Sequence, residues 1–114
     1  MSAISKMERM TLDELEDLLR DYFQGKREVL KVILFGSFAE GTNTRRSDVD
    51  IAVIMDTRKR FLERYDDFSD LYEVLRIPVD LIIWTPQEVE RIKHRPFVRD
   101  VLAKGKVIYE RGEE

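Results

Sequence analysis

The chain lacks several features on which whole classes of protein depend. It contains no cysteine, which excludes disulfide frameworks, cysteine-ligated zinc and cysteine nucleophiles. It has no run of about 18 apolar residues and no signal-peptide pattern, which favours a cytoplasmic protein that does not bind membranes. Its 20 basic residues do not exceed its 23 acidic ones, so we expect no strong nucleic-acid binding.

What is present is the composition of a folded protein. Hydrophobic residues make up 43% of the 114 residues and charged residues 38%, which indicates a globular chain. This length predicts a single domain over residues 1–114, with residues 1–10 as a loosely held arm. No repeat, low-complexity tract or linker divides the chain.

The spacing of apolar residues predicts alternating helices and strands. We expect a capped helix from residue 11 to 24, strands at 29–35, 48–55, 79–84 and 106–110, a one-turn helix at 37–40, a long amphipathic helix over 61–75, and helices over 86–93 and 97–104. This order predicts an α/β (α+β) domain in which helices flank a mixed β-sheet.

Three acidic residues stand at the start of otherwise apolar strands. Period-two geometry places Asp48 and Asp50 on one face of a strand, with Cα atoms roughly 7 Å apart. The two carboxylates could bind one or two hard cations, or they could simply lie at the solvated strand mouth. Asp80 alone could be an ordinary strand-edge residue. If the two strands are neighbours, all three carboxylates meet, which is tolerable only with cations such as Mg²⁺.

A glycine-serine turn precedes this strand by ten residues. Gly36 ends the first strand, and Ser37 can begin a one-turn helix. Backbone N–H groups and the serine hydroxyl could bind phosphate oxygens there, or the turn could serve only to reverse the chain. It is not a Walker loop, because the Gly-Lys-Ser/Thr ending is missing. A phosphate-binding turn beside paired carboxylates indicates metal-assisted phosphoryl or nucleotidyl transfer.

The combined pattern resembles a known family. The string Gly36-Ser37, ten further residues and Asp48-Val49-Asp50 is similar to the signature of the minimal nucleotidyltransferases (MNT) of the DNA polymerase β-like superfamily. Asp80 falls where that family has its third metal ligand. The resemblance spans nearly the whole chain and implies the polymerase β-like nucleotidyltransferase fold.

The same resemblance implies roles for individual residues. Asp48, Asp50 and Asp80 would be catalytic and would hold two Mg²⁺ ions. The nucleotide, with ATP as the expected substrate, would be bound by Gly36, Ser37 and Ser47.

The resemblance also implies a function. Some members of the family are encoded beside HEPN-domain proteins and act as antitoxins by adding AMP to a tyrosine of the toxin. The expected activity is therefore Mg²⁺-dependent transfer of AMP, or another NMP, from an NTP to a hydroxyl of a partner protein, with any oligomer formed through that partner. One alternative is a non-catalytic module that acts on a HEPN partner by contact. Another is nucleotidyl transfer to a small molecule, which would normally need a further acceptor domain.

Overall fold

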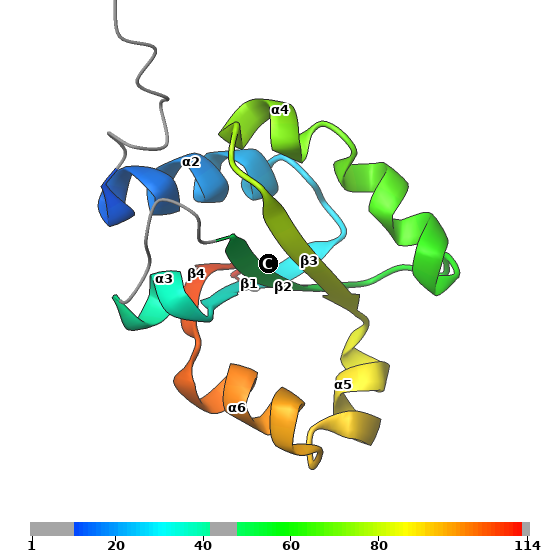
Figure 1. The fold of residues 1–114 in the computed structure, drawn as a ribbon. Coiled ribbons are helices and arrows are strands. Elements are labelled where there is room, and N and C mark those ends of the chain that lie inside the picture. The colour runs from blue at the N-terminus through cyan, green and yellow to red at the C-terminus, as the bar shows by residue number, and fades with distance from the viewer. Residues whose placement is uncertain (1–10, 42–47, 113–114) are drawn as a thin grey trace, which may run out of the picture.

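The computed structural model describes residues 11–41 and 48–112 (Figure 1). Its strands are β1 (Val29–Phe35), β2 (Val49–Met55), β3 (Val79–Trp84) and β4 (Lys106–Glu110). Its helices are α2 (Leu12–Gln24), α3 (Ser37–Glu40), the 3-10 helix η1 (Phe61–Phe68), α4 (Leu71–Leu75), α5 (Pro86–Ile92) and α6 (Pro96–Lys104). None of these helices is both long enough and apolar enough to cross a bilayer.

The four strands form one mixed sheet in the order β3-β2-β1-β4. β1 is antiparallel to both β2 and β4, whereas β3 is parallel to β2. The prediction of a mixed sheet flanked by helices is confirmed. Because β2 and β3 are parallel and adjacent, their first residues lie side by side at the same end of the sheet.

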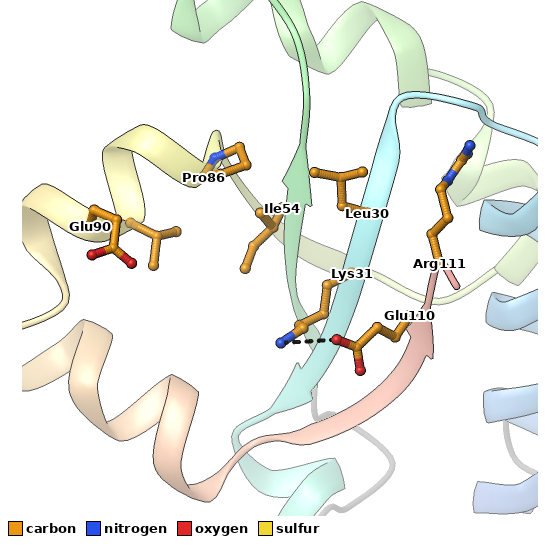
Figure 2. Close-up of a pocket in the computed structure, with 8 residues that line it drawn as sticks. Leu30, Lys31, Ile54, Pro86, Glu90, Glu110 and Arg111 are labelled. Carbon is orange, nitrogen blue, oxygen red and sulfur yellow. Dashed lines mark ion pairs between the residues drawn. The ribbon is translucent and has the colours of Figure 1, made fainter. Parts of the chain in front are cut away.

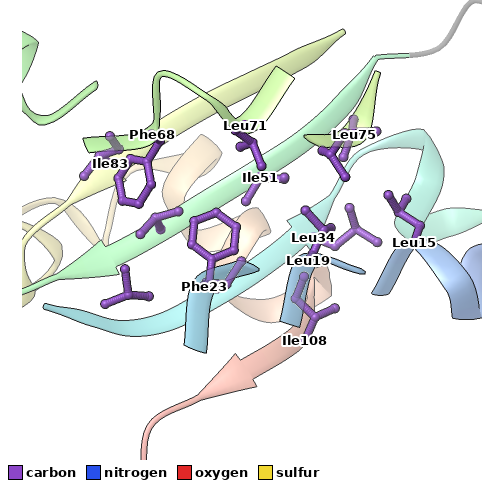
Figure 3. Packing of buried hydrophobic residues seen from close by; sticks show 14 of the residues in the cluster. Leu15, Leu19, Phe23, Leu34, Ile51, Phe68, Leu71, Leu75, Ile83 and Ile108 are labelled. Atoms are coloured by element: carbon purple, nitrogen blue, oxygen red, sulfur yellow. The ribbon is translucent and has the colours of Figure 1, made fainter. Parts of the chain in front are cut away.

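Helices cover both faces of the sheet (Figure 1). Residues Val49, Ile51 and Val53 of β2 belong to the larger core, which includes side chains from α2 and α4 and is shown in part in Figure 3. Their neighbours Ala52 and Ile54 belong to a smaller core with side chains from α5 and α6. Asp50, Ala52 and Ile54 are alternate residues of β2, and alternate residues of a strand point to the same face. The Asp50 carboxylate therefore lies on the α5/α6 side of the sheet.

Two helix starts confirm the capping signals in the sequence. The Thr11 side chain accepts a hydrogen bond from the Glu14 N–H, and the Glu14 carboxylate accepts one from the Thr11 N–H. Thr85 and Glu88 make the same reciprocal pair at the start of α5, where Pro86 occupies the first helical position. Apart from the segment over 61–75, the other predicted element bounds agree with the structure to within one residue.

The single long helix predicted over residues 61–75 is wrong. The segment forms η1, then a turn at residues 69–70, and then the separate short helix α4. Part of the reason is local: Asp66, Asp67, Ser69 and Asp70 have side chains that compete with helical backbone hydrogen bonds.

The rest of the reason is tertiary, because η1 is tied to the edge strand β3. The Tyr65 hydroxyl donates to the Leu81 carbonyl at 2.8 Å. Arg64 donates to the Ile83 carbonyl at 3.3 Å and makes two hydrogen bonds to Glu88, at 2.8 and 2.9 Å. These contacts fix the direction of η1 along β3 and do not allow one straight helix to continue to residue 75.

Candidate active site

The structure brings two of the three predicted carboxylates side by side. Asp50 and Asp80 are register partners across the parallel β2–β3 pair. Asp48 immediately precedes β2, and the N–H of the next residue, Val49, donates to the Pro78 carbonyl at 2.9 Å. This bond holds the start of β2 against the start of β3. Asp48 and Asp80 are exposed and Asp50 is half-buried, so ligands can reach all three side chains.

The electrostatics of the cluster show that Asp50 carries an unfavourable charge. Burial raises the pKa of the Asp50 carboxyl above its ordinary value, and the charge of Asp80, a hydrogen bond with Asp80 and the charge of Asp48 raise it further. A nearby cation would have the opposite effect and favour the ionised form.

The donor set fits a hard cation such as Mg²⁺. Asp48, Asp50 and Asp80 provide only carboxylate oxygens, which are the ligands that Mg²⁺ prefers. Within residues 11–41 and 48–112, however, no three or more acidic, histidine or cysteine side chains form a group that could hold a metal ion as they stand. Asp50 and Asp80 are nevertheless register partners, and Mg²⁺ usually keeps several waters in its coordination shell and needs no all-protein cage.

Gly36 lies directly against the Asp50 carboxylate. The last residue of β1, Phe35, is the register partner of Asp50, so the following turn approaches the same side chain. Gly36 has φ 76° and ψ −153°, and a Cβ atom at this position would overlap Asp50 Oδ2. The glycine therefore does more than end a strand, because it leaves the space that the carboxylate occupies. Ser37 follows as the first residue of α3.

The contact between Gly36 and Asp50 was missed by sequence reasoning. The pattern indicated a turn and a possible phosphate site, but the contact depends on the antiparallel register of β1 and β2. Ser47 falls outside the described residues, and its role in nucleotide binding stays a prediction.

A cleft of about 170 Å³ lies beside the Gly36 turn. It is formed between α3 and α6 and is lined by Phe35, Gly36, Ala39, Glu40, Asp100, Lys104 and Gly105. Phe97, at the start of α6, is 53% exposed and packs edge-to-face on Phe35, with ring centroids 5.8 Å apart. The cleft touches the Gly36 turn and has Phe35 in its lining, but it contains none of the three carboxylates.

A larger groove of about 270 Å³ lies at the other end of the sheet (Figure 2). Its floor includes Leu30 and Ile54, and its rim includes an ion pair between Lys31 and Glu110, with Nζ and Oε2 3.5 Å apart. It contains none of the three carboxylates. Its size therefore does not make it the catalytic site.

A sheet edge that gathers carboxylates beside a glycine turn is an arrangement suited to metal-assisted transfer of phosphoryl or nucleotidyl groups. Comparison with known families agrees with this class. The family described as polymerase beta, nucleotidyltransferase matches residues 17–114. The chain belongs to this nucleotidyltransferase family.

One named relative and two solved structures are also similar to this chain. A protein of Methanocaldococcus jannaschii named protein adenylyltransferase MJ0604 is 30% identical over 106 residues, which cover 90% of this chain and 98% of the relative. A solved toxin-antitoxin structure with AMP-PNP is 26% identical, with a TM-score of 0.59, covering 90% of this chain and 75% of that one. A structure of a tri-AMPylated Shewanella oneidensis HEPN toxin in complex with MNT antitoxin has a TM-score of 0.52 at 22% identity, covering 88% and 70%, and shows the same fold.

Proposed function

We propose that this chain transfers AMP from ATP to a hydroxyl group of a partner protein, and that it requires Mg²⁺. The observation that carries this proposal is the pairing of Asp50 with Asp80 beside Asp48 and Gly36. An arrangement that places like charges together at an exposed strand edge is unfavourable unless a cation joins them. A domain that acted by contact alone would gain nothing from such a cluster.

Asp48, Asp50 and Asp80 are the residues that would hold the metal, with two ions as the expected number. When bound, the ions would supply positive charge to the transferring phosphate and to the leaving pyrophosphate. Asp80 is exposed on the edge strand β3, where it can orient the hydroxyl of an incoming acceptor.

The turn at Gly36 and Ser37 would bind the phosphates of ATP. Because Gly36 has no side chain, the backbone of this turn can lie directly against the Asp50 carboxylate. Ser37 offers a hydroxyl and a backbone N–H to phosphate oxygens. The match to a toxin-antitoxin structure with AMP-PNP, an ATP analogue, supports this assignment. Ser47 is proposed as a third nucleotide-binding residue on the basis of the sequence pattern.

The proposed partner is a HEPN-domain toxin, which this chain would neutralise as a cytoplasmic antitoxin. Two findings support the proposal. Relatives at 30% identity carry the name protein adenylyltransferase, and the fold matches chains from toxin-antitoxin complexes. Modification of the toxin would explain why the catalytic carboxylates open onto the protein surface.

The test is transfer from ATP labelled at the α-phosphate, in the presence of Mg²⁺ and the product of the neighbouring gene. We expect the double variant Asp48→Asn/Asp50→Asn to stop labelling and to leave the fold as stable or more stable, because it removes charge repulsion. Asp21→Asn/Asp66→Asn is the matched control, since it removes two exposed carboxylates elsewhere on the surface. Equal labelling by the wild-type chain and the Asp48→Asn/Asp50→Asn variant would falsify the assignment.

A further inference from the structure

Phe97, in the first turn of α6, is an exposed aromatic side chain on the face of the sheet that carries the Asp50 carboxylate. Val98 and Val101 attach α6 to the smaller core, and Phe35 packs against that same core. Asp50 points to this side of the sheet, because it alternates along β2 with buried residues of the larger core. Phe97 itself is 53% exposed, and apolar surface of this kind gains free energy when a ligand covers it.

Two short steps connect Phe97 to the carboxylates. Its ring lies edge-to-face on the Phe35 ring, with centroids 5.8 Å apart and ring planes at 79°. Phe35 is the register partner of Asp50 in the antiparallel β1–β2 pair, and the Cα atoms of such partners lie roughly 4.5–5.5 Å apart. An edge-to-face pair uses at most one face of each ring, so at least one face of Phe97 remains for another flat group.

The cleft between α3 and α6 connects Phe35 to the proposed phosphate site. Both Phe35 and Gly36 line it, and Gly36 lies directly against the Asp50 carboxylate. Its volume of about 170 Å³ is below the roughly 300–1,000 Å³ of typical small-molecule sites, so it suits one part of a nucleotide and not the whole molecule. Only a ribose separates the base of a nucleotide from its phosphates, so phosphates at the Gly36 turn would bring the base to this region.

The charges along the cleft favour an uncharged part of the nucleotide. Glu40 and Asp100 contribute two carboxylates and Lys104 contributes one ammonium group, so negative charge exceeds positive charge in the lining. A phosphate is disfavoured beside this excess, whereas a base and a ribose carry no charge. Asp100 and Lys104 follow Phe97 by three and seven positions, so the three side chains lie on one side of α6.

We propose that Phe97 is the base-stacking residue of this chain: the base of the bound nucleotide lies against its exposed ring, and a purine binds more tightly than a pyrimidine. This inference rests on the proposed function, because it takes the phosphates to bind at the Gly36 turn. Loss of the aromatic ring beneath a stacked base typically weakens binding by about 5- to 150-fold. A purine is favoured because its larger ring system covers more apolar surface.

The experiment measures binding by isothermal titration calorimetry in the presence of Mg²⁺. The ligands are analogues of ATP and CTP that cannot transfer a nucleotide, and inorganic triphosphate, which has the phosphates without a base. Phe97→Leu keeps an apolar side chain but removes the aromatic face, and Phe97→Trp provides one again. Phe61→Leu is the matched control. Phe61 is 48% exposed and lies edge-to-face on Tyr65 with centroids 5.7 Å apart, but Tyr65 packs against the larger core, on the other face of the sheet.

We expect Phe97→Leu to weaken binding of the ATP analogue by about fivefold or more and to leave the affinity for inorganic triphosphate unchanged. Unchanged triphosphate binding also shows that the variant is folded. The wild-type preference for the ATP analogue over the CTP analogue should shrink in Phe97→Leu. Phe97→Trp should bind both analogues at least as tightly as the wild-type chain, and Phe61→Leu should bind every ligand as the wild-type chain does.

Three results would overturn the stacking assignment. They are an unchanged affinity of Phe97→Leu for the ATP analogue, an equal loss of affinity for the analogue and for inorganic triphosphate, or the same loss in Phe61→Leu. Unchanged nucleotide affinity together with weaker labelling of the neighbouring gene product would place Phe97 at the protein acceptor instead. Failure of the proposed function is a separate result: the stacking assignment would stand on the binding data, but no AMP would be transferred from labelled ATP to the neighbouring gene product.

Discussion

Replacing Gly36 with alanine adds one methyl group at the point where β1 reaches the carboxylates. The backbone there has φ 76° and ψ −153°, a region almost confined to glycine, so a side chain costs roughly 1–3 kcal/mol. The new Cβ atom would overlap Asp50 Oδ2 and lie 3.1 Å from Asp50 Cγ. Rotating that carboxylate away costs roughly 0.5–1.5 kcal/mol more. We therefore expect Gly36→Ala to lower the free energy of unfolding by about 2–4 kcal/mol.

Gly41 provides a control for the backbone contribution. Its φ is also 76°, with ψ 14°, but a Cβ atom there would meet nothing within 4 Å. Gly41→Ala should therefore cost only about 1–2 kcal/mol. The overlap itself is measured by repeating Gly36→Ala in an Asp50→Ala background, where the loss should shrink by about 1 kcal/mol. Urea unfolding measures the stabilities of the wild-type chain and of the four variants, and equal losses from Gly36→Ala in the two backgrounds would refute the steric reasoning.

The same substitution should also reduce catalysis. A side chain displaced by about 1 Å can reduce a rate about 100-fold, and Gly36→Ala must move the Asp50 carboxylate. We expect AMP transfer to fall by about this factor in the folded variant and to change little in Gly41→Ala. Wild-type transfer by Gly36→Ala, at a temperature where it is fully folded, would show that the position of Asp50 does not depend on this glycine.

Three further perturbations test the site and its supports. Mg²⁺ at tenfold excess over its dissociation constant should stabilise the wild-type chain by about 1.4 kcal/mol but not Asp50→Asn, and an equal thermal shift would place the ion elsewhere. Tyr65→Phe removes the hydrogen bond to Leu81 and should cost about 1 kcal/mol without changing AMP transfer. Hydrogen bonds from Arg64 lower the pKa of Glu88 from 4.5 to about 2, so this pair stabilises the fold fully above pH 4.5 and loses its effect as the pH falls towards 2. Glu88→Gln should therefore cost up to about 3 kcal/mol at pH 7 and almost nothing near pH 2, and a loss independent of pH in urea unfolding would contradict this.

The sequence was sufficient to predict the strands, because their positions depend on local periodicity. Asp48 and Asp50 alternate with buried residues, and this alternation determines their side of the strand whatever the neighbouring strands are. From the sequence alone, we could predict that Asp80 joins these two carboxylates only if its strand lies beside theirs. It required β3 to lie parallel to β2 with residue 80 opposite residue 50, and register is a property of the pair of strands.

The prediction of one long helix over residues 61–75 is wrong for a similar reason, because the structure there depends on contacts with another element. Apolar residues at steps of three and four are compatible with one α-helix, but also with a 3-10 helix followed by a short α-helix. The choice depends on Arg64 and Tyr65, whose polar atoms bind carbonyl groups of β3 that no neighbouring strand covers. An edge strand with unpaired carbonyls is a liability, so side chains that cover it stabilise the fold even when they interrupt a helix. The broken helix also leaves α4 as a separate unit that ends at Arg76, next to the start of β3. The segment that the sequence pattern failed to predict is thus the one whose side chains cover the open edge of β3.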